Sequence, residues 1–338
     1  MRSRNLILTT LMVLLLSGCA TLTQTFTTLI PKAVEKNVLS GREGVNGPVL
    51  VVKIDDTNSA HPQIGLEDAD VVYIEQVEGG LTRIAAVFSS VIPMRIGPVR
   101  SARISDIEIM SQYGRVAFAY SGAQKKLLPV IAAANLQNLG AQAQSPTIYT
   151  TDPARKQPFA MVLRADLLMQ KIIDKAYVID SARSVGWSFG DIKSVGVPIE
   201  RVVLNWPAAT YNAIWSGSES RWHLTHNNEP NLTETGKTLG PTTFVIQMVS
   251  ITPSSYSDKF GGNTPFSNTV GTGTGYILRD GRSYTATWSR PTADVGTSWT
   301  ALDGSEITFA PGQVWVALID TEPDFTLITA SAKPSTTK

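Results

Sequence analysis

Short apolar runs alternate with stretches of helical periodicity in the first half of the chain. Apolar or β-branched runs of strand length occupy residues 49–54, 71–74, 84–88 and 116–120. Two longer stretches, 125–139 and 163–176, carry apolar residues at helical spacing. Ser105 and Glu108 have the spacing of a capping box, which predicts a further helix that starts at Ser105. The pattern predicts a mixed α/β domain over residues 48–188.

Helical spacing disappears after about residue 189, and short strand candidates take its place. These candidates are residues 201–205, 211–215, 222–226, 243–249, 276–279, 283–288, 306–309 and 314–319. Asp280-Gly281 lies between two of them and predicts a hairpin turn, and Asp303-Gly304 is a second candidate turn. We therefore predict a β-rich domain over 189–322 and a loose tail over 323–338. The predicted fold class is α+β, a mixed α/β N-terminal domain followed by a β-rich C-terminal domain.

The N-terminus has the pattern of a secretory leader. Basic residues precede an apolar run over 6–16, which is about half the length that spans a bilayer. The run ends in Leu16-Ser17-Gly18-Cys19, which resembles a bacterial lipobox. The resemblance implies that residues 1–18 are a signal peptide and that Cys19 becomes lipidated with fatty acids such as palmitate. Residues 19–47 are then a lipidated cysteine and a tether. The expected location is the extracytoplasmic face of the bacterial cell membrane, with the lipid anchor in the membrane.

The overall charge of the chain is close to zero. The sequence has 29 basic and 28 acidic residues and a single cysteine. A nucleic-acid partner would need a clear basic excess, so we expect none. Because Cys19 is assigned to the anchor, no intramolecular disulfide is expected.

Charged residues concentrate between Asp55 and Arg103, within phrases that are unusual enough to compare with known families. The phrases include Glu78-Gly79-Gly80-Leu81-Thr82-Arg83 and Gly97-Pro98-Val99-Arg100-Ser101-Ala102-Arg103. Together with Thr287-Trp288-Ser289-Arg290 and Pro311-Gly312-Gln313-Val314-Trp315, they closely resemble the YerB-like lipoproteins. That bacterial family has an N-terminal and a C-terminal domain and no established reaction. The resemblance covers most of the mature chain and implies a cell-envelope protein.

The chain departs from the family's phrases at two places. Members of the family tend to have Pro-His-Asn where this chain has Pro158-Phe159-Ala160. They also tend to have Pro-His-x-Asp where it has Pro230-Asn231-Leu232-Thr233.

Arginines gather just before the predicted helix start. Arg95, Arg100 and Arg103, with Arg83, are candidate ligand-binding residues, because guanidinium groups beside a helix N-terminus form an anion site. Phosphate or carboxylate groups of cell-wall polymers would suit it. The alternative is that these arginines pair internally with acidic neighbours, because buried charges must be paired. The candidate partners are Asp70, Glu75 and Glu78.

The candidates for catalysis are weaker. Glu75 and Glu78 are possible acid–base residues, as in glycoside cleavage. If both lie in one strand, their side chains point to opposite faces, which counts against a pair. His223 and His226 are three apart in a predicted strand and also fall on opposite faces, and His61 lies in a loop. We therefore expect no metal site and no cofactor.

Two further patterns have a structural and a functional interpretation. Gly271-Thr272-Gly273-Thr274-Gly275 lacks a following helix and the P-loop lysine, so we predict a glycine-rich β-turn or bulge. Six tryptophans of the second half either build its core or form a glycan-binding face, and the core interpretation is favoured.

The function that fits these patterns best is a cell-envelope lipoprotein that binds an anionic ligand, a cell-wall glycan or an envelope protein without catalysis. The alternative is an enzyme that acts on cell-wall peptidoglycan.

Overall fold

The computed structural model describes residues 34–258 and 261–328. Cys19 and the predicted signal peptide lie outside the described residues. The helices are α2 (Ile104–Ser111), α3 (Leu128–Ala133) and α4 (Ala165–Asp174), with 3-10 helices η1 (Asn58–Ala60), η2 (Leu66–Asp68), η3 (Glu78–Gly80) and η4 (Ala141–Ala143). None of the helices in these ranges combines the length and the apolar character that a membrane crossing requires.

Strands dominate the described residues. The strands of the first half are β1 (Leu50–Asp55), β2 (Val71–Gln76), β3 (Thr82–Phe88), β4 (Arg95–Ile96), β5 (Val116–Ala119), β6 (Leu136–Asn138), β7 (Tyr149–Thr151) and β8 (Met161–Arg164). Those of the second half are β9 (Val197–Trp206), β10 (Ala209–Ser216), β11 (Arg221–His226), β12 (Glu229–Pro230), β13 (Thr243–Met248), β14 (Ile251–Ser257), β15 (Asn263–Ser267), β16 (Gly271–Arg279), β17 (Arg282–Arg290), β18 (Ser298–Ala301), β19 (Val314–Ile319) and β20 (Asp324–Leu327).

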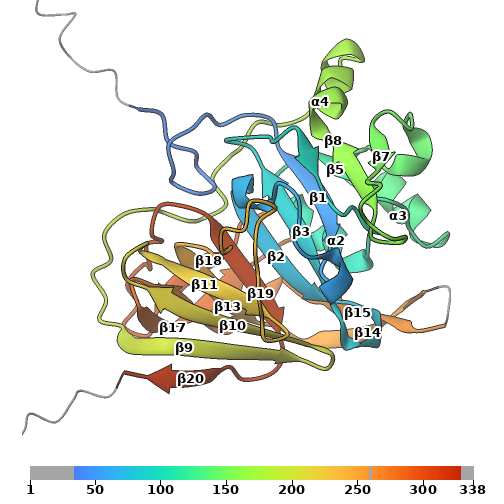
Figure 1. Ribbon diagram of the computed structural model, residues 1–338. Helices are drawn as coiled ribbons and strands as arrows, with labels where there is room; N and C mark the ends of the chain where they lie inside the picture. Colours follow the sequence, from blue (N-terminus) through green and yellow to red (C-terminus); the bar gives the residue numbers. More distant parts are fainter. Residues whose placement is uncertain (1–33, 259–260, 329–338) are drawn as a thin grey trace, which may run out of the picture. The chain divides into compact units, whose positions relative to one another are not determined.

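One mixed sheet runs through both halves of the chain. Over the described residues its strand order is β12-β11-β10-β9-β17-β16-β13-β19-β2-β3-β1-β5-β6, with β18 on β17 and β20 on β9. The joint is β19, which pairs in parallel with β13 on one side and with β2 on the other. Figure 1 shows this late strand, in red, beside the early strands in blue and cyan. The two domains are therefore parts of one hydrogen-bonded sheet.

The central strands are buried on both faces, so their residues divide between two cores. Along β1, Leu50, Val52 and Ile54 join one core, and Val51 joins the other. This division follows from the alternation of side chains in a strand. The first core includes residues of α4, and the second includes residues of α2 and α3. Near the ends of β1, β2 and β3, the second face carries charged residues in place of apolar ones, and these belong to the arginine cluster and the buried ion pairs described below.

The strand predictions are largely confirmed, and the errors concern helices and segment ends. The helix predicted over 125–139 is only α3, which begins at Leu128 because Pro129 fits a first helical turn, and β6 follows it. In the helix predicted over 163–176, the first residues belong to strand β8, and α4 begins at Ala165. Residues 306–309 form isolated bridges rather than a strand. The hairpin of β14 and β15 has no counterpart among the predictions.

The predicted tether and tail are both partly folded. Leu39 and Ser40 are fully buried, and the Ser40 hydroxyl donates to Asp70 Oδ1 at 2.7 Å. The chain is thus packed from Lys36, well before the predicted start at residue 48. At the other end, β20 pairs with β9 inside the segment predicted as a tail. Polar composition suggested loose ends, but these segments are held by backbone pairing and by buried hydrogen bonds.

The glycine-rich segment and the tryptophans have structural roles. Gly271–Arg279 is strand β16, so the predicted turn or bulge is wrong. A Cβ atom at Gly273 would lie 2.6 Å from Trp288 Nε1, and glycine therefore leaves room for the indole ring. The Asp280-Gly281 turn is confirmed between β16 and β17. Five of the six tryptophans are buried and Trp215 is partly buried, which confirms the core interpretation.

Candidate functional site

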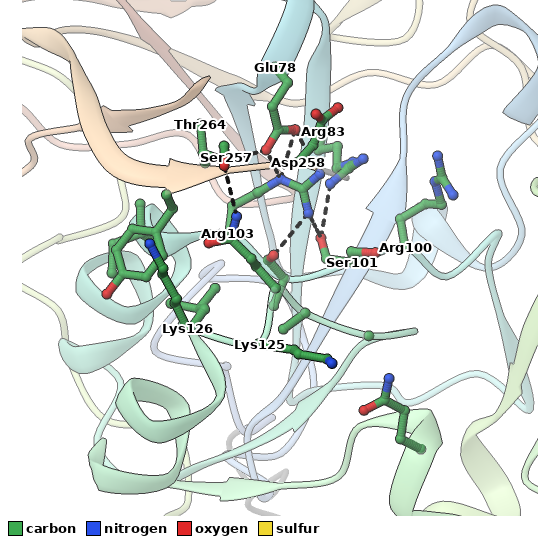
Figure 2. Close-up of a pocket in the computed structure, with 18 residues that line it drawn as sticks. Glu78, Arg83, Arg100, Ser101, Arg103, Lys125, Lys126, Ser257, Asp258 and Thr264 are labelled. Atoms are coloured by element: carbon green, nitrogen blue, oxygen red, sulfur yellow. Dashed lines mark hydrogen bonds and ion pairs between the residues drawn. The ribbon is translucent and has the colours of Figure 1, made fainter. Parts of the chain in front are cut away.

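Three arginines of the predicted cluster line one open cavity, which we call the arginine pocket. Its volume is about 690 Å³. The charged residues that line it are Glu78, Arg83, Arg100, Arg103, Lys125, Lys126 and Asp258. Among the described residues the lining thus holds five basic side chains against two acidic ones. Figure 2 shows Arg83 and Arg103 side by side below Glu78, with Lys125 and Lys126 farther out.

The pocket is assembled from both halves of the chain. Arg83 lies on β3, while Arg100 and Arg103 lie on the segment between β4 and α2. That segment is fixed by backbone hydrogen bonds from Arg100 N to Lys53 O and from Ser121 N to Arg100 O, at 2.8 and 2.9 Å. The hairpin of β14 and β15 contributes Ser257 and Thr264, the orange ribbon over the arginines in Figure 2.

Two of the arginines are paired with carboxylates. Arg103 donates from Nε and Nη2 to Glu78 Oε2 at 2.9 and 2.7 Å. Arg100 forms an ion pair with Asp55. Burial alone would raise the pKa of Glu78, but the hydrogen bonds and charge of Arg103 outweigh burial and hold it below its ordinary value. Glu78 is therefore a charged partner of Arg103 in the folded protein.

Arg83 is the exception. It is only 9% exposed, and its one hydrogen bond within the described ranges runs from Nη1 to the Ser101 carbonyl at 3.2 Å. No described carboxylate is within ion-pair distance of it. Burial, together with the guanidinium groups of Arg103 and Arg100, lowers the pKa of Arg83 to about 10, and the charges of Glu78 and Asp55 oppose this shift only in part. A buried cation beside two like charges is an unfavourable arrangement that an anion in the pocket would relieve.

Arg95 does not join the other arginines. It lies on β4, its side chain is 47% exposed, and its nearest acidic group is Asp152 at 3.7 Å. It is absent from the lining of the arginine pocket. The expected grouping of four arginines is therefore a grouping of three.

The start of α2 also differs from the prediction. The helix begins at Ile104, and the Asp106 carboxylate accepts the backbone N–H of Arg103 at 2.6 Å. Ser105 and Glu108, the predicted capping box, instead accept backbone N–H groups of Ser267 and Thr269 at 3.0 and 2.6 Å. The predicted capping pair thus docks the end of the β15 hairpin. Asp106 already places a carboxylate at the positive end of the helix, which disfavours a second anion there.

Glu75 is enclosed in a separate cluster. It is fully buried at the end of β2 and forms an ion pair with Lys53, which also contacts Asp106 at 2.7 Å. We call Lys53, Glu75 and Asp106 the buried triad. Burial raises the pKa of Glu75 to about 7; Lys53 opposes this rise and Asp106 adds to it. Glu75 does not line the arginine pocket. Strand β2 ends at Gln76, and Glu78 lies in η3, so the two glutamates do not share a strand.

The structure brings together a group that the sequence analysis did not combine. Asp56, His61 and His226 place their ligand atoms within 4.8 Å of one another. His223 lies on the opposite face of β11 from His226, as predicted, and contacts Glu219 at 3.0 Å. The predicted absence of a metal site rested on the opposite faces of His223 and His226 and on the position of His61 in a loop. His61, 165 positions earlier in the chain, could be placed beside His226 only by the fold.

Comparisons with known proteins agree with the architecture. A family model described as "Protein of unknown function (DUF3048) N-terminal domain" matches residues 38–178, and the corresponding C-terminal domain model matches 202–316. The predicted boundary at residue 189 falls between these ranges and stays a prediction.

YerB of Bacillus subtilis was found to be similar both in sequence and in structure. "Putative lipoprotein YerB" from Bacillus subtilis (strain 168) is 37% identical over 83 residues, which span 24% of this chain and 25% of that protein. The crystal structure of YerB from Bacillus subtilis superposes with a TM-score of 0.72 over 86% of this chain and 99% of that chain, at 19% identity. At this level of identity the structural match shows a shared fold.

Proposed function

The chain belongs to the DUF3048 family, and from this premise we propose that it is a lipid-anchored cell-envelope protein that binds an anionic ligand in the arginine pocket. The expected ligand class is a phosphate- or carboxylate-bearing cell-wall polymer. Binding rather than catalysis is the proposed activity.

The anchor rests on Cys19 and on the relative named a lipoprotein. Replacement Cys19→Ser should release the full chain from membranes and abolish labelling by a fatty-acid probe. Membrane fractionation and probe labelling of both proteins measure this. Unchanged retention and labelling of the variant would show that the anchor assignment is wrong.

Arg83 is the single observation that supports anion binding most. Its guanidinium is buried, lies close to two other guanidinium groups and has no carboxylate partner in the described ranges. Buried charges in folded proteins are paired or bound, so this side chain has the environment of a ligand-binding residue. Arg100 and Arg103 already neutralise Asp55 and Glu78. Their guanidinium N–H groups that do not bond these carboxylates would orient the ligand.

Two features favour binding over acid–base catalysis. Glu75 is fully buried in the buried triad and cannot reach a polymer in the pocket. Glu78 has a lowered pKa because of Arg103, so it is a poor proton donor near neutral pH. Neither glutamate has the raised pKa together with the exposure that a general acid needs.

Calorimetric titration with inorganic phosphate and with soluble peptidoglycan fragments tests the proposal. Replacement Arg83→Met should weaken binding at least about tenfold, since a hydrogen bond to a charged group contributes roughly 1.5–3 kcal/mol. Because Arg83 has no described carboxylate partner, the variant leaves no carboxylate uncompensated, and its melting temperature should not fall. Arg95→Met, an arginine outside the pocket, is the matched control and should bind like the wild type.

Each other result points to a different function. Equal binding by the Arg83→Met and Arg95→Met variants would reject the arginine pocket as the site. Turnover of the fragments would instead support the alternative of a cell-wall enzyme. If neither probe binds and one envelope protein is recovered with the chain at equal stoichiometry, a scaffold role would replace anion binding.

A further inference from the structure

A second polar cluster lies away from the arginine pocket, where the two matched regions of the chain meet. Asp56 follows β1, His61 lies in the loop after η1, and His226 ends β11. Asp56 and His226 are buried, and the side chain of His61 is 15% exposed. We propose that these three residues bind a divalent transition-metal ion of the zinc type. The inference is independent of the anion-binding function proposed above.

The spacing of the ligand atoms fits one ion. His61 Nε2 is 3.3 Å from Asp56 Oδ1, and His226 Nε2 is 3.8 Å from Asp56 Oδ2. Two ligands of a tetrahedral ion with bonds of about 2.1 Å lie roughly 3.4 Å apart. The two imidazole rings are stacked, with centroids 4.6 Å apart and planes 13° from parallel. Because an ion lies in the plane of each imidazole that binds it, the stacked rings must rotate away from their near-parallel arrangement before both can bind the same ion.

His226 supplies the second, independent observation. Its residue exposure is 3%, and Nε2 has no hydrogen-bond partner within the described part of the chain. A buried polar atom without a partner is costly, and native structures rarely retain one without a reason. This unpartnered nitrogen lies beside the Asp56 carboxylate, where an ion would provide its missing contact.

The partners of His61 leave the correct nitrogen available. Nδ1 lies 3.2 Å from Asn231 Oδ1, and assigning the ring proton to Nδ1 makes this contact a hydrogen bond and leaves the lone pair on Nε2. In this tautomer Nε2, 3.3 Å from Asp56 Oδ1, is the nitrogen that would bind the ion. Metal-bound histidines usually donate their other ring N–H to an oxygen in this way.

Gln63 is the expected fourth ligand. Its Nε2 lies 3.1 Å from His61 Nε2 and 3.2 Å from Asp56 Oδ1, while its Oε1 is buried without a partner in the described residues. A half-turn of the amide exchanges the nitrogen and the oxygen. The amide oxygen would then lie near both ligands and complete a set of two imidazoles, one carboxylate and one amide oxygen. Imidazole ligands favour zinc and its neighbours over Mg²⁺ or Ca²⁺.

A shell of hydrogen bonds orients the carboxylate. Tyr211 Oη donates to Asp56 Oδ1 at 2.7 Å, and Thr82 Oγ1 donates to Asp56 Oδ2 at 2.6 Å. Once the Gln63 amide is turned and no longer donates to Oδ1, each carboxylate oxygen keeps a lone pair for an ion. His61 also lines a cavity of about 560 Å³, which gives an ion access to the cluster.

Zinc titration of the full chain tests the site. The protein is purified in detergent without a histidine tag, stripped with a chelator, and titrated with ZnCl₂ against a chromophoric chelator. We expect one ion per chain and a rise in melting temperature of several degrees, because the ion joins residues of both matched regions. His61→Ala and His226→Ala should each weaken binding at least tenfold, since even indirect contacts change metal affinity by 10–100-fold. His223→Ala, on the opposite face of the same strand, should bind like the wild type.

Absence of stoichiometric binding, or binding that survives in the His61→Ala or the His226→Ala variant, would overturn the proposal. If both variants fail to fold, CoCl₂ added to the wild type decides. A four-coordinate site gives intense visible absorption bands, and the weak spectrum of hydrated cobalt would reject the site.

Discussion

The buried triad and the arginine pocket lie on the same face of the sheet but have opposite electrostatics. In the triad, Lys53 lies between Glu75 and Asp106, and all three side chains are fully buried. In the arginine pocket, basic side chains outnumber acidic ones and the cavity opens to solvent. The charges of the buried triad pair with one another, whereas the arginine pocket has an excess of positive charge that an anion could neutralise.

The strand register explains how the difference arises. Asp55, Arg83 and Glu75 occupy one row across β1, β3 and β2, so register alone would place Arg83 between two carboxylates. Neither carboxylate pairs with it. Lys53 forms an ion pair with Glu75, and Arg100, on the segment between β4 and α2, forms an ion pair with Asp55. Adjacent positions in a sheet therefore do not identify ion pairs when longer side chains from the same strand or a loop can reach the same carboxylates.

The largest expected effect concerns the buried triad. Lys53→Met leaves Glu75 and Asp106 buried without a cation, which should lower the free energy of unfolding by about 3–5 kcal/mol. Chemical denaturation measures the loss. Lys125→Met, at an exposed lysine of the arginine pocket, is the control and should stay within about 0.5 kcal/mol of the wild type. Similar small effects for both variants would mean that the triad is not a closed ionic unit.

The pH dependence of stability tests the buried triad in a second way. The pKa of Glu75 is raised from 4.5 to about 7, so the folded state holds this proton more tightly than the unfolded chain. The associated stability is present below pH 4.5 and is lost as the pH rises through 7. Between about pH 5 and 8, the wild type should lose roughly 2–3 kcal/mol relative to Glu75→Gln, which does not titrate there. Parallel stability curves for the two proteins would contradict the raised pKa.

Much of the sheet could be predicted from local pattern, because β19 is a continuous apolar run and β1 is mostly apolar and β-branched. The hairpin of β14 and β15 could not. Its sequence is rich in Ser, Thr and Pro, and its partner surfaces on α2 and η3 lie about 160 to 190 positions away. The tertiary fold decides which segments so distant in the chain pair with each other, and the local sequence pattern does not predict it.

Prediction of the sites was limited for the same reason. The arginine phrases identified three residues of the pocket, but chain proximity also suggested Arg95, which β4 carries away from the cavity. The cluster of Asp56, His61 and His226 was missed because its members come from both halves of the chain. One signal was present in two phrases that the sequence analysis singled out: Phe159 lines the same cavity as His61, and Asn231 Oδ1 lies 3.2 Å from His61 Nδ1.

The smallest expected effect sharpens the comparison within the arginine pocket itself. Glu78 is one of two described acidic residues in the lining, and its carboxylate neutralises Arg103. Glu78→Gln removes that negative charge and keeps an amide oxygen for the hydrogen bond. Removing one nearby repulsive charge should strengthen phosphate binding by about 1 kcal/mol, or roughly fivefold, measured by calorimetry at low salt. The gain should shrink as salt is added, because screening weakens interactions at an open cavity. Weaker binding by the variant would mean that Glu78 serves mainly to hold Arg103 in position. The Glu78–Arg103 pair would then be a structural ion pair, like those of the buried triad.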